Sequence, residues 1–107
     1  LQARRAFNVT SWDAPFLMRN PAPAALMPEN FPERVFITFD VDGLDPAVIG
    51  ETGTPVPGGL GWYQALELGT QVIGFDVVEL APQSGKIASD FAAALLVYSL
   101  MGLALSV

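Results

Sequence analysis

The sequence predicts an α/β fold in which a parallel β-sheet has helices on both faces. Two short runs rich in β-branched and aromatic residues, at 34–41 and 72–80, are typical of strands in such a sheet. A helical pattern at residues 60–71 lies between them, and parallel strands require a crossover connection of this kind. A final apolar stretch at 91–105 predicts a second helix, buried against its own domain or a neighbouring subunit.

Residues 1–33 are weakly patterned, and we treat them as separate from a C-terminal domain at 34–107. Residues 1–7 are compatible with the end of a helix, and residues 8–15 with a turn or a short strand. Prolines then interrupt any long element, although a short helix is predicted at 24–27. The strands and motifs that argue for a function all follow this segment.

Asp40 and Asp42 stand where the first predicted strand ends, two positions apart on an extended backbone. Their side chains therefore point to the same side, next to the strand 34–41, which we predict to be buried on both faces. Two carboxylates at the rim of an apolar sheet repel each other and lose hydration, so a hard divalent cation between them is one explanation. The alternative is that they are turn formers that bind their own backbone, in keeping with the following Gly43. A calcium loop of the helix–loop–helix type fits poorly, because its third ligand position is Leu44.

A long loop at residues 42–57 follows, and it exceeds the connection length of about 2–6 residues that is common in such folds. This length indicates a functional loop, in which Thr54 supplies a hydroxyl. The glycine pair at 58–59 permits a tight entry into the helix at 60–71, where a side chain would clash. Gly69 is expected to end that helix.

Glu79 lies at the end of the second predicted strand, 72–80. The carboxyl ends of parallel strands meet at one edge of a sheet, so Glu79 is expected on the same rim as Asp40 and Asp42. A carboxylate there costs desolvation free energy unless it is paired. The partner is either a cationic ligand or a nearby basic residue such as Lys86.

Ser89 or Asp90 is expected to cap the final helix. Residues 91–107 contain no charged side chain, which puts this stretch at the lower edge of the ~17–25 residues that span a bilayer. Its alanines and its glycine suit close packing, and no Lys or Arg follows it. We therefore predict a helix buried in protein and no membrane span.

The composition argues against some classes of function. A net charge of −6 with only five Lys and Arg argues against nucleic-acid binding and is compatible with a cationic small substrate. Without Cys there is neither a disulfide nor a thiol nucleophile. No signal peptide is visible at the N-terminus, and we expect a cytoplasmic protein.

Apolar residues are unusually abundant in this chain. Hydrophobic residues make up 51% and charged residues 15%, against about 25% charged in average globular proteins. A chain of 107 residues also buries a smaller fraction of its surface than a larger one. We therefore expect part of the surface to be covered, because the chain is either the C-terminal portion of a larger protein or a homo-oligomer.

Three segments resemble the ureohydrolase family, which comprises the arginases and agmatinases. They read FDVDGLDP from Phe39, ETGTPVPGGL from Glu51 and DVVELAP from Asp76, and their order and spacing match the family. The resemblance covers about residues 34–105. It implies a three-layer α/β/α fold and a pair of manganese ions that activate a water, which attacks the guanidinium carbon of the substrate and releases urea.

The resemblance also implies a role for each candidate residue. Asp40 would bridge the two manganese ions and Asp42 would bind one of them, whereas Glu79 and Thr54 would contact the substrate. Asp45 would shape the loop or support the ligands, and no residue is assigned to catalysis itself. The family draws two His and further Asp ligands from earlier segments. The chain has no His, so we expect it to hold part of a site and to be inactive alone.

The motifs do not single out one substrate. Pro57 within PVPGGL favours agmatinases, and hence polyamine metabolism, over arginases, while agmatine, arginine, guanidinobutyrate and related compounds remain open.

Two other functions are compatible with parts of the sequence. A D-x-D motif also binds manganese in glycosyltransferases, although this chain has few basic groups for a nucleotide diphosphate. A degenerate ureohydrolase-like domain that only packs against partners is the non-enzymatic alternative.

Overall fold

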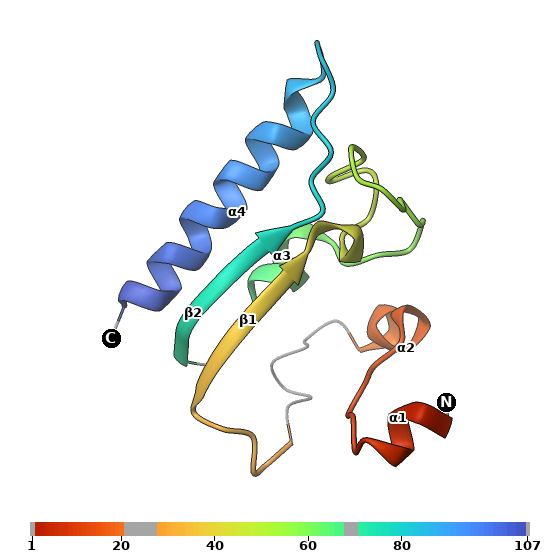
Figure 1. Cartoon of the computed structure of the whole chain (residues 1–107), viewed down its shortest axis with the longest axis vertical. Coiled ribbons are helices and arrows are strands. Elements are labelled where there is room, and N and C mark those ends of the chain that lie inside the picture. The colour runs from red at the N-terminus through yellow and green to blue at the C-terminus, as the bar shows by residue number, and fades with distance from the viewer. Residues whose placement is uncertain (1, 21–27, 68–70, 107) are drawn as a thin grey trace.

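The computed structural model describes residues 2–20, 28–67 and 71–106. The order of its elements places one helix between two strands and a long helix after them (Figure 1). The elements are α1 Gln2–Ala6, α2 Ala14–Arg19, β1 Arg34–Asp40, the 3₁₀ turn η2 Val41–Gly43, α3 Trp62–Leu66, β2 Gln71–Val78 and α4 Ile87–Leu105.

β1 and β2 form a parallel pair, which confirms the predicted α/β class. The register runs from Arg34 opposite Gln71 to Asp40 opposite Val78. Helix α3 lies in the connection between the strands, as predicted for a crossover. The carboxyl ends of the two strands lie side by side, next to the loop that follows β1 (Figure 1).

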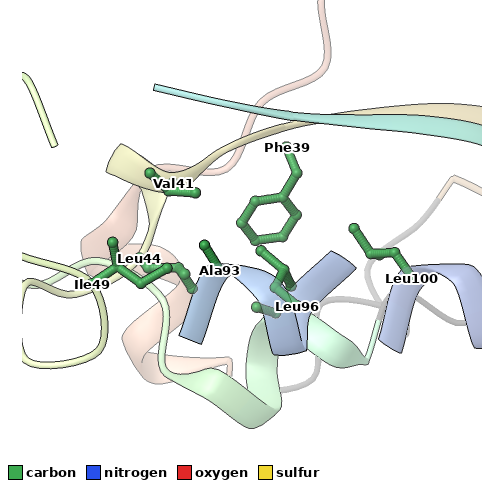
Figure 2. Packing of buried hydrophobic residues seen from close by; sticks show 8 residues of the cluster. Phe39, Val41, Leu44, Ile49, Ala93, Leu96 and Leu100 are labelled. Carbon is green, nitrogen blue, oxygen red and sulfur yellow. The ribbon is translucent and has the colours of Figure 1, made fainter. Parts of the chain in front are cut away.

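The core lies on one face of this sheet, where α4 packs along β2 (Figure 2). Phe39 points from β1 toward α4, and buried side chains of the loop after β1 pack beside it. Helix α4 contributes residues spaced three and four apart, which form a single helical face. The buried cluster consists of Phe39, Val41, Leu44, Ile49, Ala65, Ala93, Leu96 and Leu100.

The second face of the sheet is exposed in the part of the chain that the structure describes. Along β1 the burial alternates, so that Ile37 and Phe39 face the core whereas Phe36 is 60% exposed. The prediction that this strand is buried on both faces is therefore wrong for the described residues. Apolar residues occupy both faces, but α3 and α4 both contribute to the cluster around Phe39, and neither covers Phe36.

Two short helices precede the sheet. Helix α1 agrees with the helix end expected at residues 1–7. Helix α2 differs from the prediction of a turn or short strand. Asp13 at its N-cap and Pro15 in its first turn are helix-start signals that identify it. The helix predicted at 24–27 lies outside the described residues.

Both later helices differ from their predicted bounds. Helix α3 is short, and at its start Gln64 Oε1 accepts a hydrogen bond from Gly61 N at 3.0 Å. Its expected end at Gly69 lies outside the described residues.

Helix α4 begins at Ile87, earlier than predicted, so that Ser89 lies inside the helix and is not its cap. The reason is tertiary, because the Ser89 hydroxyl binds a distant loop.

Among the described residues, α4 is long and apolar enough to cross a membrane, with a mean hydropathy of 1.7. The core helix of a soluble protein meets the same criterion but is mostly buried, whereas 22% of the apolar window of α4 is buried here, on the face that contains Ala93, Leu96 and Leu100. The predicted burial of this helix is therefore present on one face only. Length and composition therefore do not decide between a membrane-spanning helix and a core helix, and the absence of a membrane span stays a prediction.

Candidate metal and substrate site

Asp40 and Asp42 lie at the carboxyl end of β1, as predicted. Asp40 is the last residue of the strand, and its Oδ1 accepts a hydrogen bond from Asp42 N at 2.9 Å. This bond closes the turn η2. Asp40 therefore has the turn-forming role that the sequence left open as an alternative to metal binding. The Asp40 side chain is exposed, so a ligand can also reach its carboxylate.

The carboxylate of Asp42 has two different surroundings. Thr54 Oγ1 donates a hydrogen bond to its Oδ2. Its Oδ1 is buried and has no hydrogen-bond partner among the described residues. A buried oxygen that makes no bond loses hydration free energy, so native structures rarely leave one without a partner. Oδ1 of Asp42 is therefore suited to bind a cation.

The described residues supply only part of a set of metal ligands. Asp40 and Asp42 offer carboxylate oxygens, which suit Mg²⁺, Ca²⁺ or Mn²⁺. Within residues 2–20, 28–67 and 71–106, no group of three or more His, Cys, Asp and Glu side chains is placed to hold an ion. The two carboxylates fit a metal site that further ligands must complete.

Glu79 immediately follows β2, and the register places the preceding Val78 opposite Asp40. This agrees with the common edge that the sequence predicts. Glu79 is exposed and has a φ of 66°, a left-handed conformation that is rare for a residue with a side chain. Its Oε2 lies beside Gly53, since a Cβ placed on that glycine would be 3.9 Å from it.

Lys86 forms its ion pair with Glu51, so the pairing of Lys86 with Glu79 that the sequence left open is wrong. Lys86 Nζ lies 3.5 Å from Oε1 of Glu51, in the loop after β1. Ser89 Oγ donates a hydrogen bond to Oε2 of the same carboxylate. The bond from Ser89 holds the pKa of Glu51 below its ordinary value against the effect of burial, and Lys86 acts in the same direction as Ser89.

Glu51 is the residue of this region that the sequence analysis missed. It is the only charged side chain within residues 46–66, and it is 16% exposed. A lone charge in an apolar loop is a usable signal, because such a side chain requires a partner when it is buried. The partner Ser89 lies 38 residues further along the chain, where no local pattern identifies it.

Asp45 shapes the loop, in agreement with the sequence-based expectation. Its carboxylate accepts hydrogen bonds from Ala47 N and Gly58 N, each at 2.9 Å. These two bonds hold the pKa of Asp45 below its ordinary value, and the bond from Ala47 N has the larger effect. Gly59 passes so close to Leu44 that a Cβ would lie 2.5 Å from the Leu44 carbonyl carbon, which confirms the predicted clash at the second glycine of the pair. A Cβ at Gly58 would meet nothing within 4 Å, but the φ of 88° at Gly58 favours glycine.

A pocket of about 320 Å³ lies beside Asp40, between β1 and the two ends of the following loop. This volume is at the lower end of the range of about 300–1,000 Å³ that is usual for sites that bind small molecules. The pocket is lined by Ile37, Thr38, Phe39, Asp40, Gly43 and Leu60.

The fold and the site together define a class of protein: an α/β domain with acidic side chains at the carboxyl edge of parallel strands, where such folds bind their ligands. Comparison with known proteins identifies the family within that class. The pattern of the arginase family matches residues 14–102, and the chain belongs to this family. The match begins before residue 34, where the resemblance of the motifs begins.

Three known proteins illustrate the similarity. N(1)-aminopropylagmatine ureohydrolase of Synechocystis is 49% identical over 65% of this chain and 25% of its own length. A protein of the same name from Thermus thermophilus is 36% identical over 96% of this chain and 37% of its own length. The structure of proclavaminate amidino hydrolase from Streptomyces clavuligerus is 27% identical, with a TM-score of 0.83 over 97% of this chain and 38% of that one. The chain thus spans about a quarter to two fifths of the length of these proteins.

Proposed function

We propose that the chain contributes part of the active site of a cytoplasmic, manganese-dependent ureohydrolase that hydrolyses an agmatine-like guanidino compound to urea and an amine. Membership of the arginase family supports this class of reaction. The names of the two N(1)-aminopropylagmatine ureohydrolases support a substrate of the agmatine type.

The carboxylate of Asp42 is the single observation that carries the proposal. One of its oxygens is held by Thr54, and the other is buried without a partner among the described residues. Metal ligands are typically held by such a supporting contact. Asp40, two residues earlier at the same edge, offers a second and accessible carboxylate.

Asp40 and Asp42 would hold manganese together with ligands from outside the described residues. The bound metal supplies a water activated for nucleophilic attack near neutral pH. Glu79 would bind the guanidinium group, whose planar donors match a carboxylate in a bidentate fashion. In the reaction that this site would support, one molecule of water would replace the alkyl nitrogen on the guanidinium carbon, and both of its protons would end on that nitrogen. The products would be urea and an alkylammonium ion.

Binding of manganese to the 107-residue chain tests the proposal, with EPR spectroscopy as the measure of free Mn²⁺. We expect weak binding by the parent chain and at least about tenfold weaker binding by Asp42→Asn, because a charged ligand is lost. Asp13→Asn is a matched control, since Asp13 is exposed and pairs with Arg4 in the N-terminal segment. Equal affinity in the parent and in Asp42→Asn would contradict the proposal.

We expect the chain by itself to release no urea from agmatine in the presence of manganese. Two ions with octahedral preference are not held at useful affinity by two carboxylates and water. A urea assay on the purified chain, with and without a chelator, measures this. Urea release that the chelator abolishes would show that the ligands in this chain are sufficient.

Exposed apolar surface favours a second function, that of a packing or oligomerisation module. The accessible area of the chain is 7421 Å², against about 5,800 Å² expected for a compact monomer of its mass. Large apolar side chains are exposed on both strands and on α4, and such surface is usually covered by protein. They include Phe36, Ile73, Phe91, Tyr98 and Leu105.

Sedimentation at high concentration tests the second function. We expect a homo-oligomer, and a monomer that binds no dye specific for apolar surface would contradict it. The manganese titration separates the two functions, because a module without a metal site would associate while binding no Mn²⁺.

A further inference from the structure

We propose that Glu51 and Ser89 position Glu79 for the substrate, because their contact fixes the loop after β1 against the segment after β2. The inference deepens the proposed function and rests on it only for the role given to Glu79. We define the Glu51–Ser89 contact as three hydrogen bonds of the Ser89 hydroxyl. It accepts from Gly50 N and Glu51 N and donates to Glu51 Oε2.

Ser89 is 2% exposed, so its hydroxyl has almost no access to water. The two accepted bonds have lengths of 3.2 Å from Gly50 N and 3.4 Å from Glu51 N. A hydroxyl has one proton and two lone pairs, so Ser89 uses its full bonding capacity on this loop. Lys86 adds an ion pair to Glu51, but Lys86 is 59% exposed, which makes the pair the weaker part of the attachment.

The same stretch of loop is bonded to the chain that follows Glu79. Ala81 N donates a hydrogen bond to Glu51 O at 2.9 Å. Thr52 and Leu80 form an antiparallel bridge next to it. Movement of Glu51 must therefore displace the backbone immediately after Glu79.

Glu79 needs this support because its φ of 66° is unfavourable for a residue with a side chain. Such conformations persist when the surrounding structure fixes them, and they are concentrated at functional sites. The Glu79 carboxylate lies beside Gly53, where a Cβ would be 3.9 Å from Oε2. The loop thus holds the backbone next to Glu79 and also forms the wall beside its carboxylate.

The loop also contains Thr54, whose hydroxyl binds Asp42. The groups that we assign to the substrate and to the metal are therefore both attached to the short stretch 51–54. The contact with Ser89 anchors this stretch to α4, the helix that packs along β2. Anchoring fixes the substrate-binding carboxylate relative to the metal ligands.

NMR spectroscopy of the 107-residue chain tests the inference. Ser89→Ala removes the hydroxyl, and Ser99→Ala is the matched control, since Ser99 Oγ binds Leu95 O within the same helix. We expect Ser89→Ala to speed hydrogen exchange of the Ala81 amide by roughly tenfold. We also expect it to remove the left-handed chemical shifts of Glu79 and to weaken binding of the probe, agmatine, by a similar factor. The control should leave all three unchanged.

Conservative variants keep the test decisive. Ser89→Thr retains the hydroxyl and should restore all three readouts. A folded Ser89→Ala variant with the exchange rate of Ala81 and the shifts of Glu79 unchanged would overturn the inference. If Ser89→Ala does not fold, Glu51→Ala takes its place, because it removes the carboxylate that accepts from Ser89 and pairs with Lys86. Unchanged values in that variant would then be the contrary result.

The readouts also separate this inference from the function on which it rests. If Glu79→Gln leaves the agmatine affinity of the assembled enzyme unchanged, the role proposed for Glu79 fails whatever the Ser89 variants show. A different result would count against the inference alone: Ser89→Ala binds agmatine as tightly as the parent does while the backbone of Glu79 changes. The contact would then be structural and would not position the carboxylate.

Discussion

Thr54 donates a hydrogen bond from its hydroxyl to Oδ2 of Asp42, from a position twelve residues further along the chain. The bond holds one oxygen of the carboxylate, while the other is buried without a partner among the described residues. A ligand held in this way is oriented before an ion binds. The residue that the sequence assigned to substrate contact thus supports a metal-ligand candidate here, and its contact with substrate stays a prediction.

Replacing Thr54 with Val should therefore weaken manganese binding to the chain. The substitution keeps the shape of the side chain but removes the proton donor. Loss of a contact that orients a metal ligand typically costs about 10–100-fold in metal affinity. Titration with Mn²⁺, followed by EPR spectroscopy, measures the effect. Thr54→Ser, which keeps the hydroxyl, should bind manganese as the parent does.

Thr52→Val provides the control from the same loop. Thr52 Oγ1 is buried and has no hydrogen-bond partner within the described ranges. Its removal should leave manganese affinity unchanged and stability equal or higher, since no bond is lost. If the Thr52 and Thr54 variants weakened manganese binding equally, the role given to Thr54 would be wrong.

Asp40→Asn and Glu79→Gln should separate metal binding from substrate binding in the assembled enzyme. Asp40→Asn removes the charge of a proposed metal ligand, so manganese content and activity should fall together, and excess manganese should restore part of the rate. Glu79→Gln should keep its manganese and lose roughly ten- to a hundredfold in kcat/KM, since a hydrogen bond to a charged group is worth about 1.5–3 kcal/mol. Metal analysis beside steady-state kinetics measures both. Loss of manganese from Glu79→Gln would identify Glu79 as a ligand or as the support of one.

Acid should destabilise the fold partly through Asp45. Bonds from Ala47 N and Gly58 N hold its pKa below the ordinary value of 3.8. The ionised carboxylate therefore stabilises the fold above that pH, and this contribution is lost as the pH falls through the lowered pKa. Asp45→Asn should lower the melting temperature at neutral pH and flatten its further decline below pH 3.8.

Thermal scans between neutral and strongly acidic pH check this profile. Glu51, whose pKa is also lowered, should preserve part of the acid decline in the Asp45→Asn variant. An acid profile identical to that of the parent would show that Asp45 does not contribute.

Leu96→Ala should lower the free energy of unfolding by about 2–5 kcal/mol, because Leu96 is fully buried and its removal leaves a cavity. Leu95 precedes it on the same helix and is 43% exposed. The same chemical change at Leu95 should cost about 1 kcal/mol or less. Chemical denaturation of both variants measures the difference. Equal costs would show that α4 does not pack on the sheet through the face that contains Leu96.

The strands could be predicted because their signals are local. An apolar run ended by turn residues marks β1 and β2, and the length of the connection implies parallel pairing. Asp40 and Asp42 could be placed at the rim for the same reason, since they follow directly from the end of β1. The buried state of one Asp42 oxygen could not be predicted, because it depends on how the loop folds back.

The sequence predicts local structure less well where contacts between residues far apart in the chain determine it. Ser89 has the residue type of a helix cap, yet its hydroxyl is used by Gly50 and Glu51, and the helix starts earlier. Lys86 is nearer to Glu79 in sequence but pairs with Glu51. The left-handed backbone of Glu79 follows from no property of its residue type, because glutamate seldom adopts it.

The parallel pairing of β1 and β2 has a consequence for the order of events during folding. Arg34 pairs with Gln71, so the sheet cannot form until the whole intervening chain has closed into a loop. Pairing of strands so far apart in sequence makes folding slow compared with a helical protein of this size. Helix α4 can start to form locally, but it gains most of its stability only when its apolar face meets the strands. We therefore expect Asp42, Thr54 and Glu79 to come together in the final, slow step, so that a metal bound there would also trap the folded state.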